Sequence, residues 1–411
     1  MAVQISNVRS CVHGLVPLIA SGTNAAMGRC ALLAAIAGAV GLLSWHGSVA
    51  MLAFAPTIVV VWRAARSRMQ AFIFLYAYYL AASRGLLLGA GIFFGDSLTA
   101  PAWAYGIGIW LVPNAILAAT WAVCWGRSLR IARLGVALLL TSLPPIGVFG
   151  WANPLTAAGA IFPGLSWLGM ALTICLLAVL AHRLRPLLVS GLCALAIAAN
   201  AAYVPADPPG WVSIDTTVGT DRDAASEFSR LQAVQHQVTS HIHAHPEAKV
   251  FVLPELVGGN WDANAIWWED IGEQLTARGQ TALIGAYLPY ARNHRYVNAL
   301  FSIGRDPDWA LVDRVPVPIS MWRPWDSQSA TAFWWESGVT SIAGIRAASL
   351  VCYEQLLIWP IAVSMANRPE IIVGASNVWW ARGTSIPAIQ LQATSAWARL
   401  LGIPSVWAKN E

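Results

Sequence analysis

The segment Ala347-Ala-Ser-Leu-Val-Cys352-Tyr-Glu354 runs an apolar stretch into a thiol and a carboxylate. Two other apolar stretches also end in a reactive side chain: Val250-Phe-Val-Leu-Pro-Glu255 ends in a carboxylate, and Leu311-Val-Asp-Arg314 ends in a guanidinium. Sites of α/β folds are assembled where strands end. The three segments therefore predict an α/β domain with one site built from Glu255, Arg314 and Cys352.

The residue types of this candidate site suit nucleophilic catalysis. A thiol is weakly ionised at neutral pH and benefits from a base, and Glu255 fits that role if a dry pocket raises its pKa. Arg314 would then stabilise an oxyanion. Taken singly, each feature has a structural explanation, because a cysteine after a strand usually packs as a small core residue. The three together, in this order, are more specific.

Strands and helices alternate from residue 206 onward, which favours an α/β domain. We expect the preceding Pro205-Ala-Asp-Pro-Pro-Gly210 stretch to be a linker. The expected strands are Trp211–Asp215, Lys249–Leu253, Ala282–Tyr287, Asn298–Ile303, Trp309–Asp313, Arg346–Val351 and Ile371–Ala375. The expected helices are Ala224–Ala244 and Ile386–Leu401.

Residues 1–205 have the composition of a membrane domain. Hydrophobic residues make up 57% of the chain and charged residues 11%, whereas soluble domains are about a quarter charged. Asp96 is the single acidic residue in this half. The sequence predicts seven transmembrane helices, with an error of one. The apolar runs are 31–45, 47–62, 69–83, 102–125, 132–150, 160–182 and 186–203.

Arginines follow every second apolar run, and basic loops stay in the cytoplasm. The amino terminus is therefore expected inside, and an odd number of spans places residues 206–411 outside, in the periplasm of a bacterium. These arginines are Arg63, Arg66, Arg68, Arg127, Arg130, Arg133, Arg183 and Arg185. The net charge of +5 comes mostly from arginine, because Lys249 and Lys409 are the only lysines, and the position of the arginines between apolar runs argues against a nucleic-acid partner.

Metal and disulfide sites are not expected. The three histidines from His241 to His245 alternate, so they do not share one face of a helix. Cys352 is the one cysteine beyond residue 205, which leaves no intradomain disulfide for that half.

The motifs of the second half resemble apolipoprotein N-acyltransferases, which are membrane-embedded members of the nitrilase (carbon–nitrogen hydrolase) superfamily. The membrane half and the arginine bias further resemble TraB-type conjugal transfer proteins. The matching segments are Leu253-Pro-Glu255, His294-Arg-Tyr-Val-Asn298, Asp313-Arg314, Val351-Cys-Tyr-Glu354, Ser376-Asn-Val-Trp-Trp380 and Gln392–Arg399.

The resemblance implies a multi-spanning α-helical membrane domain at 1–205 and a four-layer α-β-β-α nitrilase-like sandwich at 206–411. It also implies ping-pong acyl transfer without a metal or organic cofactor: Glu255 is the base, Cys352 forms a thioester, and Glu354 is a supporting carboxylate. The acyl donor would be a phospholipid, and the acceptor an amine of an exported protein or lipoprotein. The implied location is the bacterial inner membrane.

The chain departs from this family at four places. Arg314 stands where the family has a lysine, and arginine cannot act as an acid near neutral pH. Ile319-Ser320-Met321 replaces Phe-Gly-Glu, and Val378 replaces an aspartate. The chain ends at Glu411, where the family would continue into its last strands and a final membrane helix. These departures favour a competing hypothesis, in which the domain is a catalytically silent scaffold of a conjugation apparatus.

Overall fold

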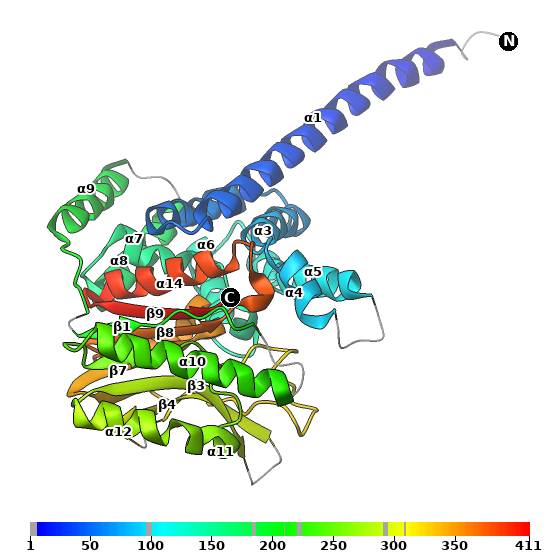
Figure 1. Cartoon of the computed structure of the whole chain (residues 1–411). Helices are drawn as coiled ribbons and strands as arrows, with labels where there is room; N and C mark the ends of the chain where they lie inside the picture. The colour runs from blue at the N-terminus through cyan, green and yellow to red at the C-terminus, as the bar shows by residue number, and fades with distance from the viewer. Residues whose placement is uncertain are drawn as a thin grey trace.

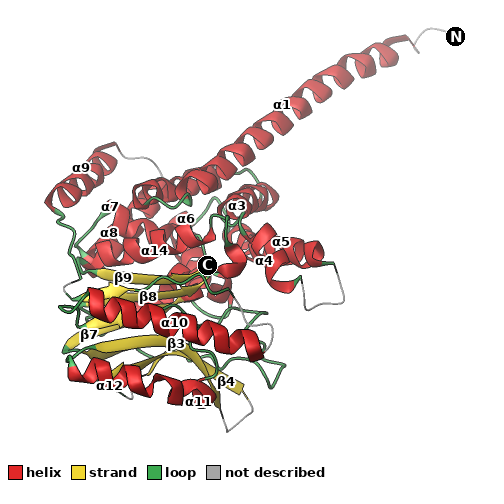
Figure 2. Cartoon of the chain, in the orientation of Figure 1, coloured by secondary structure: helices red, strands yellow, loops and turns green. Residues whose placement is uncertain are grey.

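The computed structural model describes residues 6–95, 101–182, 186–208, 210–219, 224–290, 295–307 and 310–411. Five residues that the sequence arguments used lie outside these ranges, namely Asp96, Arg183, Arg185, His294 and Trp309. Two stacked sheets form the second half of the chain, and helices make up the first half (Figure 1 and Figure 2).

The second half contains two β-sheets. The first has the order β1-β2-β3-β4-β5, with β1, β2 and β3 parallel and the last two strands antiparallel to their neighbours. The second has the order β6-β7-β8-β9, with only the β6–β7 pair antiparallel. The strands are β1 Trp211–Ser213, β2 Val250–Val252, β3 Thr281–Tyr290, β4 Arg295–Gly304, β5 Ala310–Val312, β6 Val339–Ile342, β7 Ile345–Val351, β8 Ile371–Asn377 and β9 Ser405–Asn410.

Both faces of each sheet are buried, and β2 shows how. Val250 and Val252 belong to the core between the two sheets, whereas Phe251 belongs to the core beneath the helices of the first sheet, because successive strand residues point to opposite faces. The second sheet packs its other face on the helices that follow β7 and β8. The result is the α-β-β-α sandwich expected of a nitrilase-like domain. Its helices are α10 Ala224–Ala244, α11 Trp261–Asn264, α12 Glu269–Ala277, α13 Ile358–Ala366 and α14 Ile386–Leu401, with the 3-10 turns η4 Ala265–Trp268, η5 Cys352–Leu356 and η6 Trp379–Ala381.

Helices joined by turns and loops make up the described residues of the first half, which contain no strand. Two helices, Ala25–Ser44 within α1 and Ala102–Cys124, are long and apolar enough to cross a membrane, and the pair α3–α4, bent by 61°, makes a third candidate. The elements are α1 Ser6–Ser44, η1 Val49–Thr57, α2 Ile58–Ala64, α3 Arg68–Ala82, α4 Leu86–Phe94, α5 Ala102–Cys124, α6 Arg130–Ser142, η2 Ile146–Phe149, η3 Pro154–Ala157, α7 Ala158–Ile161, α8 Ser166–Ala181 and α9 Pro186–Ala202.

Two of the seven apolar runs are not continuous helices. The run 132–150 ends its helix at Ser142, just before Leu143-Pro144-Pro145. The run 160–182 is interrupted at Phe162-Pro163-Gly164. Proline removes a helical hydrogen bond and disfavours helix in the residue before it. The seven-span topology therefore stays a prediction.

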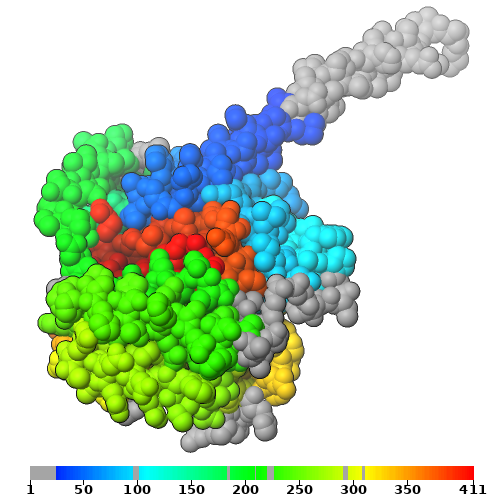
Figure 3. All heavy atoms as spheres, in the orientation of Figure 1, coloured from blue at the N-terminus to red at the C-terminus, as the bar shows by residue number. Residues whose placement is uncertain are grey.

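The helices of the first half cover the outer layer of the sandwich. Gly159 packs so closely on the backbone of Ala396 in α14 that a side chain there would collide with it. Gln392 of α14 donates to the carbonyls of Ser44 (2.8 Å) and Ser48 (2.6 Å). Figure 3 shows this carboxyl-terminal segment, in red, between the blue helices of the first half and the green surface of residues beyond 200. The two halves share one apolar core.

Candidate active site

Cys352 stands at the turn from strand β7 into η5. Its φ of +44° lies in the left-handed region, which is costly for a residue other than glycine and is found most often at functional sites. The thiol is buried, with 5% of the residue exposed. Burial and the adjacent Glu255 carboxyl raise the pKa of this thiol well above its usual value. A thiol in this environment stays protonated near neutral pH.

Glu255 follows β2 after Pro254 and lies beside the thiol. Its carboxyl lies close enough to the Cys352 thiol for each group to affect the pKa of the other. It accepts hydrogen bonds from the side-chain amide of Asn298 at 2.7 Å and from the backbone N–H of Asn377 at 3.2 Å. Only 2% of the residue is exposed. Burial outweighs these hydrogen bonds and raises the pKa of Glu255 to about 7. The group can therefore change between acid and base near neutral pH.

The carboxyl group of Asp313 lies on the same side of the site as that of Glu255. Asn298 donates to it at 3.0 Å and so bridges Asp313 and Glu255. Asp313 also accepts the backbone N–H of Val315 at 3.1 Å. Burial, followed by the charges of Glu354 and Glu255, raises the pKa of Asp313 well above its usual value. Asn298 and Asp313 were not among the site residues predicted from the sequence.

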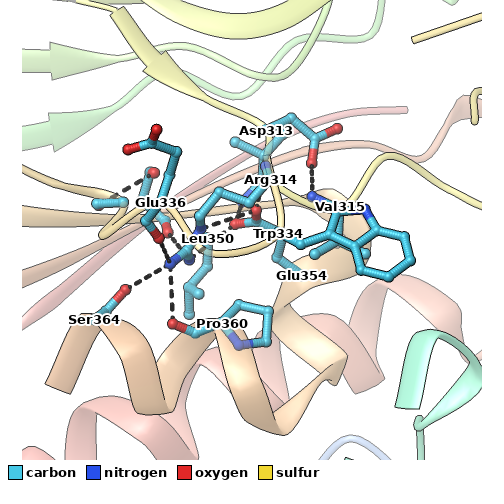
Figure 4. A network of polar contacts seen from close by, with 12 residues as sticks. Asp313, Arg314, Val315, Trp334, Glu336, Leu350, Glu354, Pro360 and Ser364 are labelled. Carbon is cyan, nitrogen blue, oxygen red and sulfur yellow. Dashed lines mark hydrogen bonds and ion pairs between the residues drawn. The ribbon is translucent and has the colours of Figure 1, made fainter. Parts of the chain in front are cut away.

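Arg314 points in the other direction, as Figure 4 shows. Its guanidinium pairs with both oxygens of Glu354, through Nε at 3.1 Å and Nη2 at 3.2 Å. The remaining donors reach the carbonyl of Ser349 and, from Nη1, the α13 helix at Pro360 O and Ser364 Oγ, each at 3.0 Å. Successive residues of an extended chain face opposite sides, so Asp313 faces Glu255 while Arg314 faces α13. These contacts occupy the donors that an oxyanion would need.

Glu354 connects Arg314 to the turn that carries the thiol. The residue is fully buried, and its Oε2 accepts the backbone N–H of Val351 at 3.2 Å. Its Oε1 accepts the backbone N–H of Arg314 as well as its Nε. The buried ion pair thus holds the ends of β5 and β7 together beneath Cys352.

An apolar pocket leads from Cys352 towards the helices of the first half. The phenol of Tyr353, the residue after the thiol, donates to the carbonyl of Val148 at 2.7 Å, which fixes one wall against η2. Gln390 of α14 completes the thiol's surroundings with its Nε2 at 3.6 Å from Sγ. The other lining residues are Trp45, Ala82, Ser83, Gly85, Leu86, Ile109, Pro113, Phe149, Trp151, Ala152, Val317, Pro318, Ile319, Leu356, Trp380, Ser385, Ile386 and Ile389.

The arrangement is suited to chemistry at sulfur. In the part of the chain that the structure describes, no three His, Cys, Asp or Glu side chains are grouped to hold a metal ion. Of the four residues expected at the site, Glu255 and Cys352 are in contact, whereas Arg314 and Glu354 form a separate pair beneath the thiol.

Part of the second half matches a known protein family. Residues 291–399 match the family model of carbon–nitrogen hydrolases. Among solved structures, an amidase from Nesterenkonia sp. is similar, with 15% identity and a TM-score of 0.36 over 51% of this chain and 78% of that one. Residues 291–399 thus carry the sequence pattern of a carbon–nitrogen hydrolase, or nitrilase, domain.

Two similar proteins identify the family to which the whole chain belongs. The chain is 34% identical over 409 residues to the conjugal transfer protein TraB of Agrobacterium fabrum, covering 93% of both chains. It is 32% identical over 383 residues to a probable conjugal transfer protein TraB of Sinorhizobium fredii, covering 90% of this chain and 95% of the relative. The chain belongs to the TraB family of conjugal transfer proteins. The resemblance predicted from the motifs is confirmed.

Proposed function

We propose that this protein is an acyltransferase that carries an acyl group as a thioester on Cys352. The observation that carries the proposal is an apolar pocket that ends at a thiol beside the buried Glu255 carboxyl. A polar, hydrated substrate would gain little from such walls, whereas burying apolar surface is favourable by about 25 cal/mol per Å². A phospholipid acyl chain has the matching chemistry.

The reaction divides into two steps. In the first, Glu255 takes the thiol proton, the sulfur attacks the ester carbonyl, and the departing alkoxide receives that proton from Glu255. In the second, an amine attacks the thioester carbon, a C–N bond forms and the C–S bond breaks. The amine loses one proton to Glu255, which returns it to the sulfur. Because the pKa of the thiol is raised, proton removal by Glu255 has to accompany attack.

The site would act at the surface of the bacterial inner membrane, with residues 206–411 in the periplasm. Arg63 and Arg130 donate to the carbonyls of His182 (3.3 Å) and Ala181 (3.5 Å), so these arginines meet at the carboxyl end of α8. Its amino end lies near Leu400 of α14, which Gly169 contacts. Basic residues gathered at the end opposite the sandwich support a cytoplasmic position for that end.

The acceptor would be an amine of an exported protein or lipoprotein. The relatives' names associate them with conjugal transfer, so a component of the conjugation machinery is the acceptor that we propose. The full membrane topology of seven spans remains part of this proposal.

One observation favours a second function, a catalytically silent scaffold. Two carboxyls, Glu255 and Asp313, act on the thiol and oppose its ionisation, and the Arg314 guanidinium is bound elsewhere. A site of this kind lacks the cation that would stabilise an oxyanion. The retained sandwich would then serve to bind a partner.

A mating assay separates the two functions. The plasmid's own gene is replaced by the variant Cys352→Ala or by the control Cys193→Ala, which removes an exposed cysteine of α9. Catalysis predicts that Cys352→Ala abolishes transfer while the protein is still inserted at wild-type level, and that Cys193→Ala has no effect. Undiminished transfer with Cys352→Ala would favour the scaffold.

A further inference from the structure

Gln390 is a buried polar side chain in the wall of the apolar pocket, next to the thiol. It is 2% exposed, lines the apolar pocket together with Cys352, and donates from Nε2 to the sulfur. Its other polar atom, Oε1, is buried and has no hydrogen-bond partner among the described residues. A buried acceptor is costly unless a donor reaches it, and no hydrogen bond from the described pocket walls reaches Oε1, although the Ser385 hydroxyl also lines the pocket.

The position of Gln390 is well defined. It lies in the middle of α14, a helix that is packed on both sheet and membrane-half residues. Its backbone carbonyl accepts the hydroxyl of Thr394 at 2.9 Å. A side chain on a rigid helix, next to the nucleophile, has the placement that orienting a reactant requires.

The structure supports an assignment for this oxygen, which rests on the thioester function proposed above. We propose that Gln390 is a specificity-determining residue, whose Oε1 accepts an N–H from a primary amine approaching the acyl group on Cys352. The number of hydrogens on the attacking atom decides which class of acceptor fits. A neutral primary amine carries two hydrogens, so one can pass to Glu255 during attack while the other stays on nitrogen and bonds to Oε1.

An alcohol has one hydrogen, which Glu255 must take, and would leave Oε1 without a partner as the new bond forms. A carboxylate or phosphate would bring only acceptors to a buried acceptor. The pocket should therefore discriminate for N–H groups, because a site built to form a hydrogen bond rejects analogues that lack the donor.

Alkylation of Cys352 tests this preference without requiring acyl transfer. Purified protein in detergent is treated with iodoacetamide or with methyl iodoacetate, which are similar in size but differ in N–H donors. The rate at Cys352 is followed by mass spectrometry of the peptide that contains it, and each rate is divided by that of free cysteine. We expect a preference for the amide of about fivefold in the wild-type protein, the value of one ordinary hydrogen bond.

Three variants define the cause of the preference. Gln390→Leu keeps the size and removes the acceptor, so the ratio should fall to one. Gln390→Glu keeps an acceptor oxygen and should retain the preference. Ile389→Leu alters the shape of the same pocket without changing its polar atoms and should leave the ratio unchanged.

A ratio of one in the wild-type protein, or a preference that persists in Gln390→Leu, would overturn the assignment. Failure of both reagents to reach Cys352 would also overturn it, because the pocket would then not admit an N–H ligand. Absence of an acyl thioester, with the preference intact, would instead contradict only the acyl-transfer function.

Discussion

Arg314 and Glu354 form a buried two-point ion pair, with Nε 3.1 Å from Oε1 and Nη2 3.2 Å from Oε2. Both residues are fully buried. The pair joins the strand end at Asp313 to the turn that carries Cys352, because Glu354 also accepts the backbone N–H of Val351. Arg314 thus contacts the residues that frame the site and not the sulfur.

This pair predicts a large loss of stability when one partner is removed. Arg314→Met leaves Glu354 buried and unpaired, which costs about 3–5 kcal/mol. Arg314→Lys should also destabilise the fold, because one ammonium cannot reach Glu354, Ser349, Pro360 and Ser364 together. Thermal unfolding followed by tryptophan fluorescence measures both. Arg323→Met, which removes a half-exposed ion pair with Asp326, is the control; equal losses in the two methionine variants would contradict this role.

The raised pKa of Glu255 predicts how modification of Cys352 depends on pH. Below about pH 7 the carboxyl is protonated and cannot accept the thiol proton; above it the carboxylate can. The rate of acylation should therefore rise through about pH 7 and then level off. Glu255→Gln should be slower by about 10²–10⁴-fold, the usual contribution of a general base, and should lack this step. A midpoint near the ordinary value of a glutamate would contradict the role of burial.

The Asn298 bridge predicts the direction in which that midpoint can be moved. Asn298 donates to the Glu255 carboxylate and so favours its charged form. In Asn298→Ala the pKa of Glu255 should rise by about one unit, since one hydrogen bond is worth about 1 kcal/mol and one unit is 1.36 kcal/mol. The rate–pH profile of Cys352 acylation measures the shift. Asn264→Ala, which removes an amide bonded to the Gly258 carbonyl, should leave the profile in place, and a downward shift in Asn298→Ala would contradict the account.

Gly285 of β3 predicts a steric effect on the base. A side chain at Gly285 would collide with the Pro254 carbonyl and lie 2.5 Å from the Cα of Glu255. Gly285→Ala should displace Glu255 and slow acylation of Cys352 by about 100-fold, the cost of a displacement of about 1 Å. Gly272→Ala, where the nearest atoms lie at 3.9 Å, is the matched control. The rate of Cys352 acylation is measured in both variants in parallel. Equal rates in the two variants would show that the base tolerates the displacement.

Much of the sandwich could be predicted from the sequence because its elements carry strong local signals. The helices at 224–244 and 386–401 have the expected ends, and each expected strand corresponds to an observed one. Strands β6 and β9 were missed. β9 ends in Lys409 and Asn410, and the buried amide of Asn410 is satisfied by Thr216 and Gly219, residues far away in the sequence.

The site was predicted only in part, for a geometric reason. Strand ends predicted that Glu255 and Cys352 lie side by side, as they do in the structure, whereas the Arg314 guanidinium points to α13 and not to the sulfur. Strand periodicity offered the missing signal: if Asp313 faces the thiol, Arg314 cannot. Gln390 and Asn298 carried no such signal, because an amide in a helix or strand is common and its partner is known only from the fold.

The central claim is that Cys352 carries an acyl group, and the intact mass of the protein purified from its native host tests it most directly. Spectra are recorded before and after mild hydroxylamine, for the wild-type protein and for Cys352→Ala. The account predicts an added mass equal to an acyl chain, which hydroxylamine removes and which Cys352→Ala lacks. An unmodified wild-type thiol, even after incubation with phospholipid, would contradict acyl transfer and leave the scaffold as the better explanation.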